Sequence, residues 1–157
     1  DRVFDQANEV VLVDLPPGTS DAALTVLQSL PVTGIVMITT PQALSAMIVR
    51  KAVKMAQIVK IPILGVIENM AGFTAPDTGR LYEIFGPSHA AEVAEMAGAL
   101  VLARLPIDPQ LAARCDSGEI EQVVCPEADR LAAALMAAAP QVAAAIGAGI
   151  GGGLFRA

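Results

Sequence analysis

The sequence has few of the residues that nucleic-acid binding requires. It contains no Trp, one Tyr and four Phe, and its ten Lys and Arg are outnumbered by sixteen Asp and Glu, which gives a net charge of −6. Nucleic-acid binders need basic patches that neutralise phosphates and aromatic side chains on which bases stack. The composition therefore argues against a nucleic-acid partner.

Cysteine and histidine are equally scarce, with two Cys and one His. The two thiols, Cys115 and Cys125, cannot build a disulfide framework or, alone, a four-thiolate metal site. The first residues, DRVFDQANEV, show no basic-then-apolar signal pattern, so we expect a cytoplasmic protein.

Charged residues are missing from residues 131–155, a stretch longer than a membrane-spanning helix. The stretch is mostly Ala and Gly, which contribute little transfer free energy compared with Leu, Ile or Phe. We therefore expect no membrane span. The interpretation is one domain over residues 1–146, closed by an Ala-rich helix, and a flexible Gly-rich tail over residues 147–157.

Short apolar runs alternate with amphipathic segments along the chain. The apolar runs are typical of strands buried on both faces; they cover residues 10–14, 34–38, 63–67 and 99–102. The amphipathic segments predict helices; they cover residues 21–30, 42–60, 89–98 and 129–139, with a short helix after Pro109. Residues 70–87 contain three Gly and two Pro and predict an irregular segment. This alternation predicts an α/β fold, a parallel sheet with helices on both faces.

Polar residues follow the expected strands at their carboxyl ends, the edge at which parallel sheets bind ligands. They are Asp14, Thr39, Thr40, Asn69 and Asp108. An Asp that closes an apolar strand suits the Mg²⁺ site of a nucleotide hydrolase, although it can equally cap the next helix. After Asp14, two stiff prolines and a Gly in the Pro16-Pro17-Gly18 segment would let the backbone approach a terminal phosphate. Both interpretations of Asp14 remain open at this point.

The segment VVLVDLPPGTSDAALTVLQSLPVTGIVMITTPQ resembles the Mrp/ApbC family, MinD-related P-loop ATPases associated with iron–sulfur cluster assembly. The likeness continues through IPILGVIENMAGF and LARLPIDPQ and covers roughly residues 11–119. It implies a P-loop NTPase fold of the MinD type, with ATP and Mg²⁺ as cofactors. By the same resemblance, Asp14 would be the Walker B magnesium residue and Pro16-Pro17-Gly18 would be switch II. Asn69 and Pro106-Ile107-Asp108 would lie beside the adenine and ribose.

The sequence departs from this family at the phosphate loop. The family's lysine-bearing segment, of the G-K-G-G-V-G-K-[ST] type, lies upstream of the DLPPG strand, and these 157 residues do not contain it. The chain therefore resembles the C-terminal part of the family's domain. Without the loop's amides, lysine and hydroxyl, we expect this chain alone not to hydrolyse ATP.

A second departure concerns the cluster ligands. Many family members carry C-P-x-C where this chain has Ala75-Pro76-Asp77-Thr78. Ala75 offers no donor atom and a neutral hydroxyl at Thr78 is a poor ligand for iron, so we expect no metal ligand here and a bound cluster is doubtful.

The resemblance implies an ATP-binding cluster carrier that acts as a homodimer and exchanges its cluster with a client or scaffold protein. One alternative is a degenerate, non-catalytic interaction module of the same fold. Another is a MinD-like positioning ATPase, which the tail does not favour because it lacks a basic amphipathic face. The resemblance also implies that the strand leading into the phosphate loop lies between the strands at 10–14 and 34–38. Without that strand, the two would expose apolar edges, so we expect this chain alone to be loosely packed or to associate.

Overall fold

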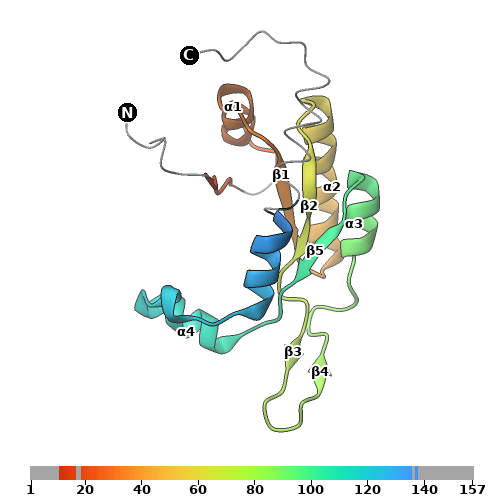
Figure 1. Cartoon of the computed structure of the whole chain (residues 1–157). Helices are drawn as coiled ribbons and strands as arrows, with labels where there is room; N and C mark the ends of the chain where they lie inside the picture. The colour runs from red at the N-terminus through yellow and green to blue at the C-terminus, as the bar shows by residue number, and fades with distance from the viewer. Residues whose placement is uncertain (1–10, 17–18, 136, 138–157) are drawn as a thin grey trace.

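A three-stranded parallel sheet forms the centre of the molecule (Figure 1). The computed structural model describes residues 11–16, 19–135 and 137. Strand β2 (Ile63–Glu68) lies between β1 (Ile35–Thr39) and β5 (Val101–Arg104), and both neighbours run parallel to it. Because all three strands run in one direction, their carboxyl ends meet at one edge of the sheet.

Helices precede, connect and follow these strands. They are α1 (Asp21–Ser29), α2 (Ala43–Ile58), α3 (Ala90–Ala97), α4 (Pro109–Ser117), the short 3₁₀ helix η1 (Ile120–Gln122) and a helix over residues 126–135. Helix α2 packs on β1, α3 packs on β2, and the two helices pack on each other. Figure 1 shows the helix of residues 126–135 on the other side of the strands from α2 and α3. The predicted α/β class is confirmed.

The core lies between β1, β2, α2 and α3. Val53 of α2, Val66 of β2 and Val93 of α3 are completely buried there. Gly65 allows Leu102 of β5 to pack against β2, because a Cβ at position 65 would lie only 2.3 Å from the Leu102 side chain. Close packing of apolar side chains therefore fixes the positions of β2 and β5.

The segment expected to be irregular contains a small hairpin. Strands β3 (Phe73–Thr74) and β4 (Leu81–Tyr82) pair antiparallel, with Phe73 opposite Tyr82. A turn connects them, in which the Gly79 N–H donates to the Ala75 carbonyl at 2.8 Å and Gly79 has a φ of 66°. Figure 1 shows this hairpin projecting away from the sheet, beyond the carboxyl end of β2.

The strand expected over residues 10–14 is wrong for the residues that the structure describes. Residues 11–14 form no strand, and Val11, Leu12 and Val13 are exposed, Leu12 to 84%. A continuous apolar run becomes a buried strand only where neighbouring strands bond to it. Strand β1 pairs with β2 alone, and within the described part of the chain no strand bonds to its other edge.

Smaller differences concern where elements begin and end. Ser20 caps α1, its hydroxyl accepting from the Ala23 N–H at 3.3 Å. Strand β5 covers Val101–Arg104 and not residues 99–102, and the last helix begins at Pro126, a residue suited to the first turn of a helix.

The Gly-rich tail expected over residues 147–157 lies outside the described residues. Among the helices that the structure describes, none is long and apolar enough to cross a membrane.

Candidate functional site

The carboxyl edge of the sheet brings two of the predicted segments together. Backbone pairing between the strands continues past their ends: the Asn69 N–H donates to the Thr39 carbonyl at 2.8 Å, and the Leu105 N–H donates to the Glu68 carbonyl at 2.8 Å. Asn69 therefore lies between the end of β1 and the turn that follows β5.

That turn is also fastened to the residues after Asn69. The Ala71 N–H donates to the Leu105 carbonyl at 2.9 Å, and the Ile107 N–H donates to the Gly72 carbonyl at 2.7 Å. We call residues 69–72 and 105–108 together the paired edge. It places Asn69 beside Pro106-Ile107-Asp108, the residues that the resemblance implies lie beside the adenine and ribose.

A hydrogen bond to the backbone of Met70 holds the Asn69 side-chain amide in one orientation. Its Oδ1 accepts from the Met70 N–H at 2.9 Å, and Met70 adopts a φ of 57°, in the left-handed region that residues other than glycine rarely occupy. Within the described residues nothing accepts a hydrogen bond from the Asn69 Nδ2. This half-buried side chain therefore offers its amide N–H groups to a hydrogen-bond acceptor on a ligand.

The turn itself combines exposed residues with a helix start. Pro106 and Asp108 are exposed and Ile107 is half-buried. Asp108 caps α4, because its Oδ1 accepts from the Gln110 N–H at 2.8 Å, and Pro109 follows it in the first helical turn. Asp108 therefore stabilises the start of α4. Its role toward a ribose stays a prediction.

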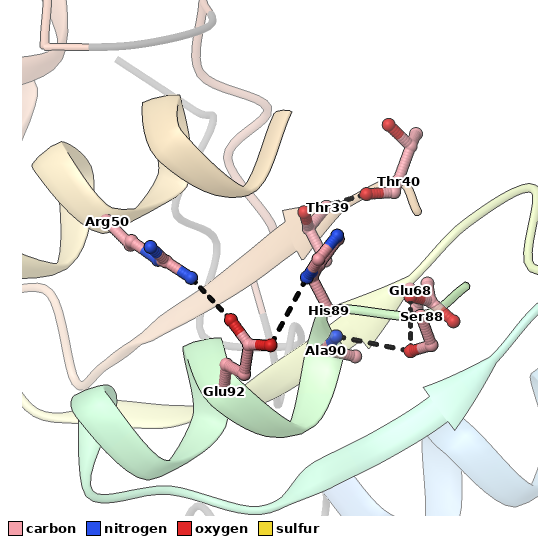
Figure 2. Close-up of polar contacts among 8 residues, drawn as sticks. All are labelled: Thr39, Thr40, Arg50, Glu68, Ser88, His89, Ala90 and Glu92. Atoms are coloured by element: carbon pink, nitrogen blue, oxygen red, sulfur yellow. Dashed lines mark hydrogen bonds and ion pairs between the residues drawn. The ribbon is translucent and has the colours of Figure 1, made fainter. Parts of the chain in front are cut away.

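A buried carboxylate that no sequence pattern singled out, that of Glu68, lies next to the paired edge. Glu68 is the last residue of β2 and is completely buried. Its Oε1 accepts from the Ser88 hydroxyl at 2.6 Å (Figure 2), and its Oε2 accepts from Arg104 Nε at 2.7 Å. A charged residue ending a run as apolar as ILGVI was the available signal, but its partners are 20 and 36 residues away in sequence.

A second polar group joins α2 to α3 beside this edge. Arg50 Nη2 lies 2.6 Å from Glu92 Oε2, and His89 Nδ1 lies 3.3 Å from Glu92 Oε1 (Figure 2). His89 holds the N-cap position of α3 without a side-chain capping bond, whereas the neighbouring Ser88 hydroxyl accepts from the Ala90 N–H. The three side chains are partly exposed, and the contact between Arg50 and Glu92 connects the two helices.

The predicted magnesium residue has a different setting. Asp14 and Pro16 are exposed and lie outside any helix or strand, while Pro17 and Gly18 fall outside the described residues. Among the residues that the structure describes, no group of three or more His, Cys, Asp or Glu is arranged to hold a metal ion. The roles of Asp14 in Mg²⁺ binding and of residues 16–18 as a switch stay predictions.

The positions expected for cluster thiolates lie at the turn of the hairpin. Ala75 is half-buried and Thr78 is exposed, and the Thr78 hydroxyl lies 3.4 Å from the Asp77 carboxylate. Cys115 lies on α4, and Cys125 directly precedes the helix of residues 126–135. Both cysteines therefore lie outside the hairpin.

Comparison with protein families and known structures gives a consistent result. A family model described as ParA, NUBPL iron-transfer P-loop NTPase, matches residues 3–143. An iron–sulfur cluster carrier protein of Aquifex aeolicus is 46% identical over 111 residues, which are 71% of this chain and 30% of that protein. One of Saccharolobus solfataricus is 40% identical over 112 residues, which are 71% of this chain and 38% of that protein.

A solved structure is similar in both sequence and fold. It is described as the nucleotide-binding protein from Archaeoglobus fulgidus in complex with ADP. The match covers 72% of this chain and 46% of the Archaeoglobus fulgidus chain, with a TM-score of 0.62 and 40% sequence identity. The chain spans only about a third of the length of the two curated relatives.

Proposed function

This chain belongs to the NUBPL-type ParA family of iron-transfer P-loop NTPases, and from this premise we propose that it is part of an ATP-dependent iron–sulfur cluster carrier of the Mrp/ApbC type. The names of the relatives support the carrier function. The coupling of ATP hydrolysis to cluster or partner transfer is our proposal, as are the homodimer and the client or scaffold protein.

The observation that carries this proposal is the paired edge. Backbone hydrogen bonds hold Asn69 next to the turn of residues 105–108, at the edge where parallel α/β sheets bind ligands. The N–H groups of the Asn69 amide, which bond to nothing in the described part of the chain, suit the acceptor nitrogens of a purine ring. The ADP named in the description of the Archaeoglobus fulgidus structure supports an adenine nucleotide as the ligand.

Each part of this edge would act on a different part of the nucleotide. Bound MgATP would supply the transferable phosphoryl group, with Mg²⁺ neutralising its charge. Asn69 would orient the base, and the Pro106-Ile107-Asp108 turn would exclude water from one side of it. Asp14 supplies carboxylate oxygens of the kind that Mg²⁺ prefers. Asp14 is exposed and lies outside any strand, and we propose that further polypeptide orders it.

We infer that the phosphate cradle comes from polypeptide beyond these 157 residues, because none of them forms a lysine-bearing glycine-rich loop. The 157 residues would then be the portion of the carrier that contacts base and magnesium. The cluster, as cargo, would need ligands other than Ala75 and Thr78, since neither side chain is a thiolate donor.

One observation favours a second candidate, a non-catalytic interaction module. The hairpin carries no thiol, and exposed apolar side chains lie on and after its second strand: Leu81, Tyr82, Ile84 and Phe85. A partner protein would cover such side chains more readily than a metal cluster would bind there.

Nucleotide binding separates the two candidates. We define the joined chain as these 157 residues preceded by a phosphate-loop segment from a family member that contains the G-K-G-G-V-G-K-[ST] pattern. If the chain is part of an ATP-dependent carrier, we expect the joined chain to bind ADP and to hydrolyse MgATP. A well-folded joined chain that binds no adenine nucleotide would favour the interaction module.

A further inference from the structure

We propose that Glu68 is a positioning residue that fastens both ends of the hairpin segment, residues 73–87, to the paired edge. Glu68 is completely buried, yet each of its carboxylate oxygens has its own partner, and its carbonyl accepts from the Leu105 N–H. One residue thus contacts Ser88, which follows the hairpin segment, and residues 104 and 105, which lead into the turn.

The first end of the hairpin segment is fastened through the backbone. Residues 71 and 72 immediately precede β3, and they bond to the turn through the Ala71 N–H and the Gly72 carbonyl at 2.9 and 2.7 Å. Glu68 lies at the start of this pairing, because its carbonyl holds Leu105, which in turn accepts from Ala71.

The second end is fastened through the Glu68 side chain. Ser88 follows the hairpin segment and donates its hydroxyl to Glu68 Oε1 at 2.6 Å, while the same hydroxyl accepts from the Ala90 N–H at 3.2 Å. The carboxylate therefore fixes the point at which the chain returns from the hairpin and enters α3 (Figure 2).

Arg104 explains why a charge is tolerated at this buried position. Its Nε donates to Glu68 Oε2 at 2.7 Å, and its side chain is 49% exposed. A buried carboxylate is stable only when its charge is paired and its oxygens are bonded, and an apolar residue of similar size would fill this space at less cost. Unlike an apolar residue, the carboxylate makes directional hydrogen bonds, which hold Ser88 and Arg104 at fixed positions relative to the end of β2.

The consequence is mechanical coupling. With both ends fastened, the hairpin and the turn of residues 105–108 move together. One consequence rests on the proposed function: a nucleotide bound at the paired edge would change the motion of the hairpin. The fastening itself can be measured without any nucleotide.

Amide hydrogen exchange of the 157-residue chain tests the fastening. Glu68→Gln keeps the shape of the side chain but removes the charge that pairs with Arg104, and it replaces one acceptor oxygen with an N–H₂ group that cannot accept a hydrogen bond. We expect exchange at residues 73–88 and 105–108 to become about tenfold faster, with exchange at residues 49–56 of α2 unchanged. Glu92→Gln, which removes an exposed carboxylate from the neighbouring α2–α3 contact, is the matched control and should leave both regions unchanged.

Two further measurements separate positioning from general stability. Ser88→Ala should accelerate exchange near residues 83–88 and leave the turn of residues 105–108 protected, because the ion pair between Glu68 and Arg104, which precedes that turn, is kept. Tyr82 is the only tyrosine and the chain has no tryptophan, so its fluorescence anisotropy reports on the hairpin. Glu68→Gln should lower that anisotropy and Glu92→Gln should not. Unchanged exchange at both ends of the hairpin, or equal acceleration throughout the core, would overturn the proposal.

Adding ADP to the joined chain distinguishes this inference from the proposed function. ADP should slow exchange at both the turn and the hairpin in the unmodified protein, and at the turn alone in Glu68→Gln. Slowed exchange at the hairpin of Glu68→Gln to the same extent would overturn the coupling. If ADP slows exchange at neither place in the unmodified protein, the proposed function fails, and the comparison without nucleotide still decides the role of Glu68.

Discussion

Arg104 and Glu68 form an ion pair across the ends of β5 and β2, in which the carboxylate is completely buried and the guanidinium is half exposed. The two residues are 36 positions apart in sequence, and their contact connects the carboxyl ends of the two strands. This arrangement makes the pair unequal: Arg104 can be hydrated when its partner is lost, but Glu68 cannot. Removing the arginine should therefore be the more damaging change.

The stability of the sheet edge provides the first prediction. We expect Arg104→Gln to lower the free energy of unfolding of the joined chain by about 1–3 kcal/mol, because a buried carboxylate loses its charged partner. Urea unfolding followed by circular dichroism measures this. Arg114→Gln removes an arginine from an ion pair on α4 whose side chains are both nearly half exposed, and it should cost less than about 1 kcal/mol. Equal losses in the two variants would show that Glu68 is not buried in solution.

The second prediction concerns the base. Asn69→Ala in the joined chain should weaken ADP binding about tenfold, the effect of losing one or two hydrogen bonds, with little change in stability. Isothermal titration calorimetry measures the affinity. Gln57→Ala is the control, because the Gln57 amide likewise makes a hydrogen bond to the backbone, donating to the Met96 carbonyl, but it lies on α2. An unchanged Kd in Asn69→Ala would remove Asn69 from the nucleotide site.

Cluster binding gives the third prediction. Anaerobic reconstitution of this chain with iron and sulfide should yield no stable, stoichiometric cluster, because the hairpin offers no thiolate. The double variant Ala75→Cys, Thr78→Cys places two thiols at the hairpin turn and should gain a charge-transfer absorbance that survives desalting. If the unmodified chain shows such an absorbance and Cys115→Ser abolishes it, the ligands lie on α4 instead.

The open edge of β1 leads to the fourth prediction. Ile38 is 60% exposed on this strand, which pairs with β2 alone in the described part of the chain. We expect the 157-residue chain to associate in a concentration-dependent manner, and Ile38→Lys to reduce that association, since a charge on an edge strand opposes pairing. Light scattering after size-exclusion chromatography measures the mass. Ile58→Lys changes an equally apolar, 80% exposed residue at the end of α2 and should have no such effect. A sharp, concentration-independent two-state unfolding transition would contradict this prediction.

The sequence was a good guide wherever one short segment determines its own structure. Ser20 before α1 has the local signal of a helix cap, and the apolar runs of β1 and β2 identify buried strands. Val11–Val13 show the limit of that reasoning. The same kind of apolar run is exposed here, because burial depends on neighbouring strands that the run itself does not encode.

The site was only partly predictable for a related reason. Asn69 could be placed at the carboxyl edge because it follows a strand directly. The contacts of Glu68 with Ser88 and Arg104 depend on how β5 and α3 pack against β2, and no local pattern announces them. The hairpin was missed because strands of two residues are too short to show alternation.

We propose above all that these residues provide the base and magnesium side of an ATP site whose phosphate cradle lies elsewhere. The most direct test is MgATP hydrolysis by three purified proteins: the 157-residue chain, the joined chain, and the joined chain with Asp14→Ala. We expect turnover in the joined chain alone, because the first protein lacks the cradle and the third lacks the carboxylate that anchors Mg²⁺. Turnover by the 157-residue chain that disappears in its own Asp14→Ala variant would contradict the claim.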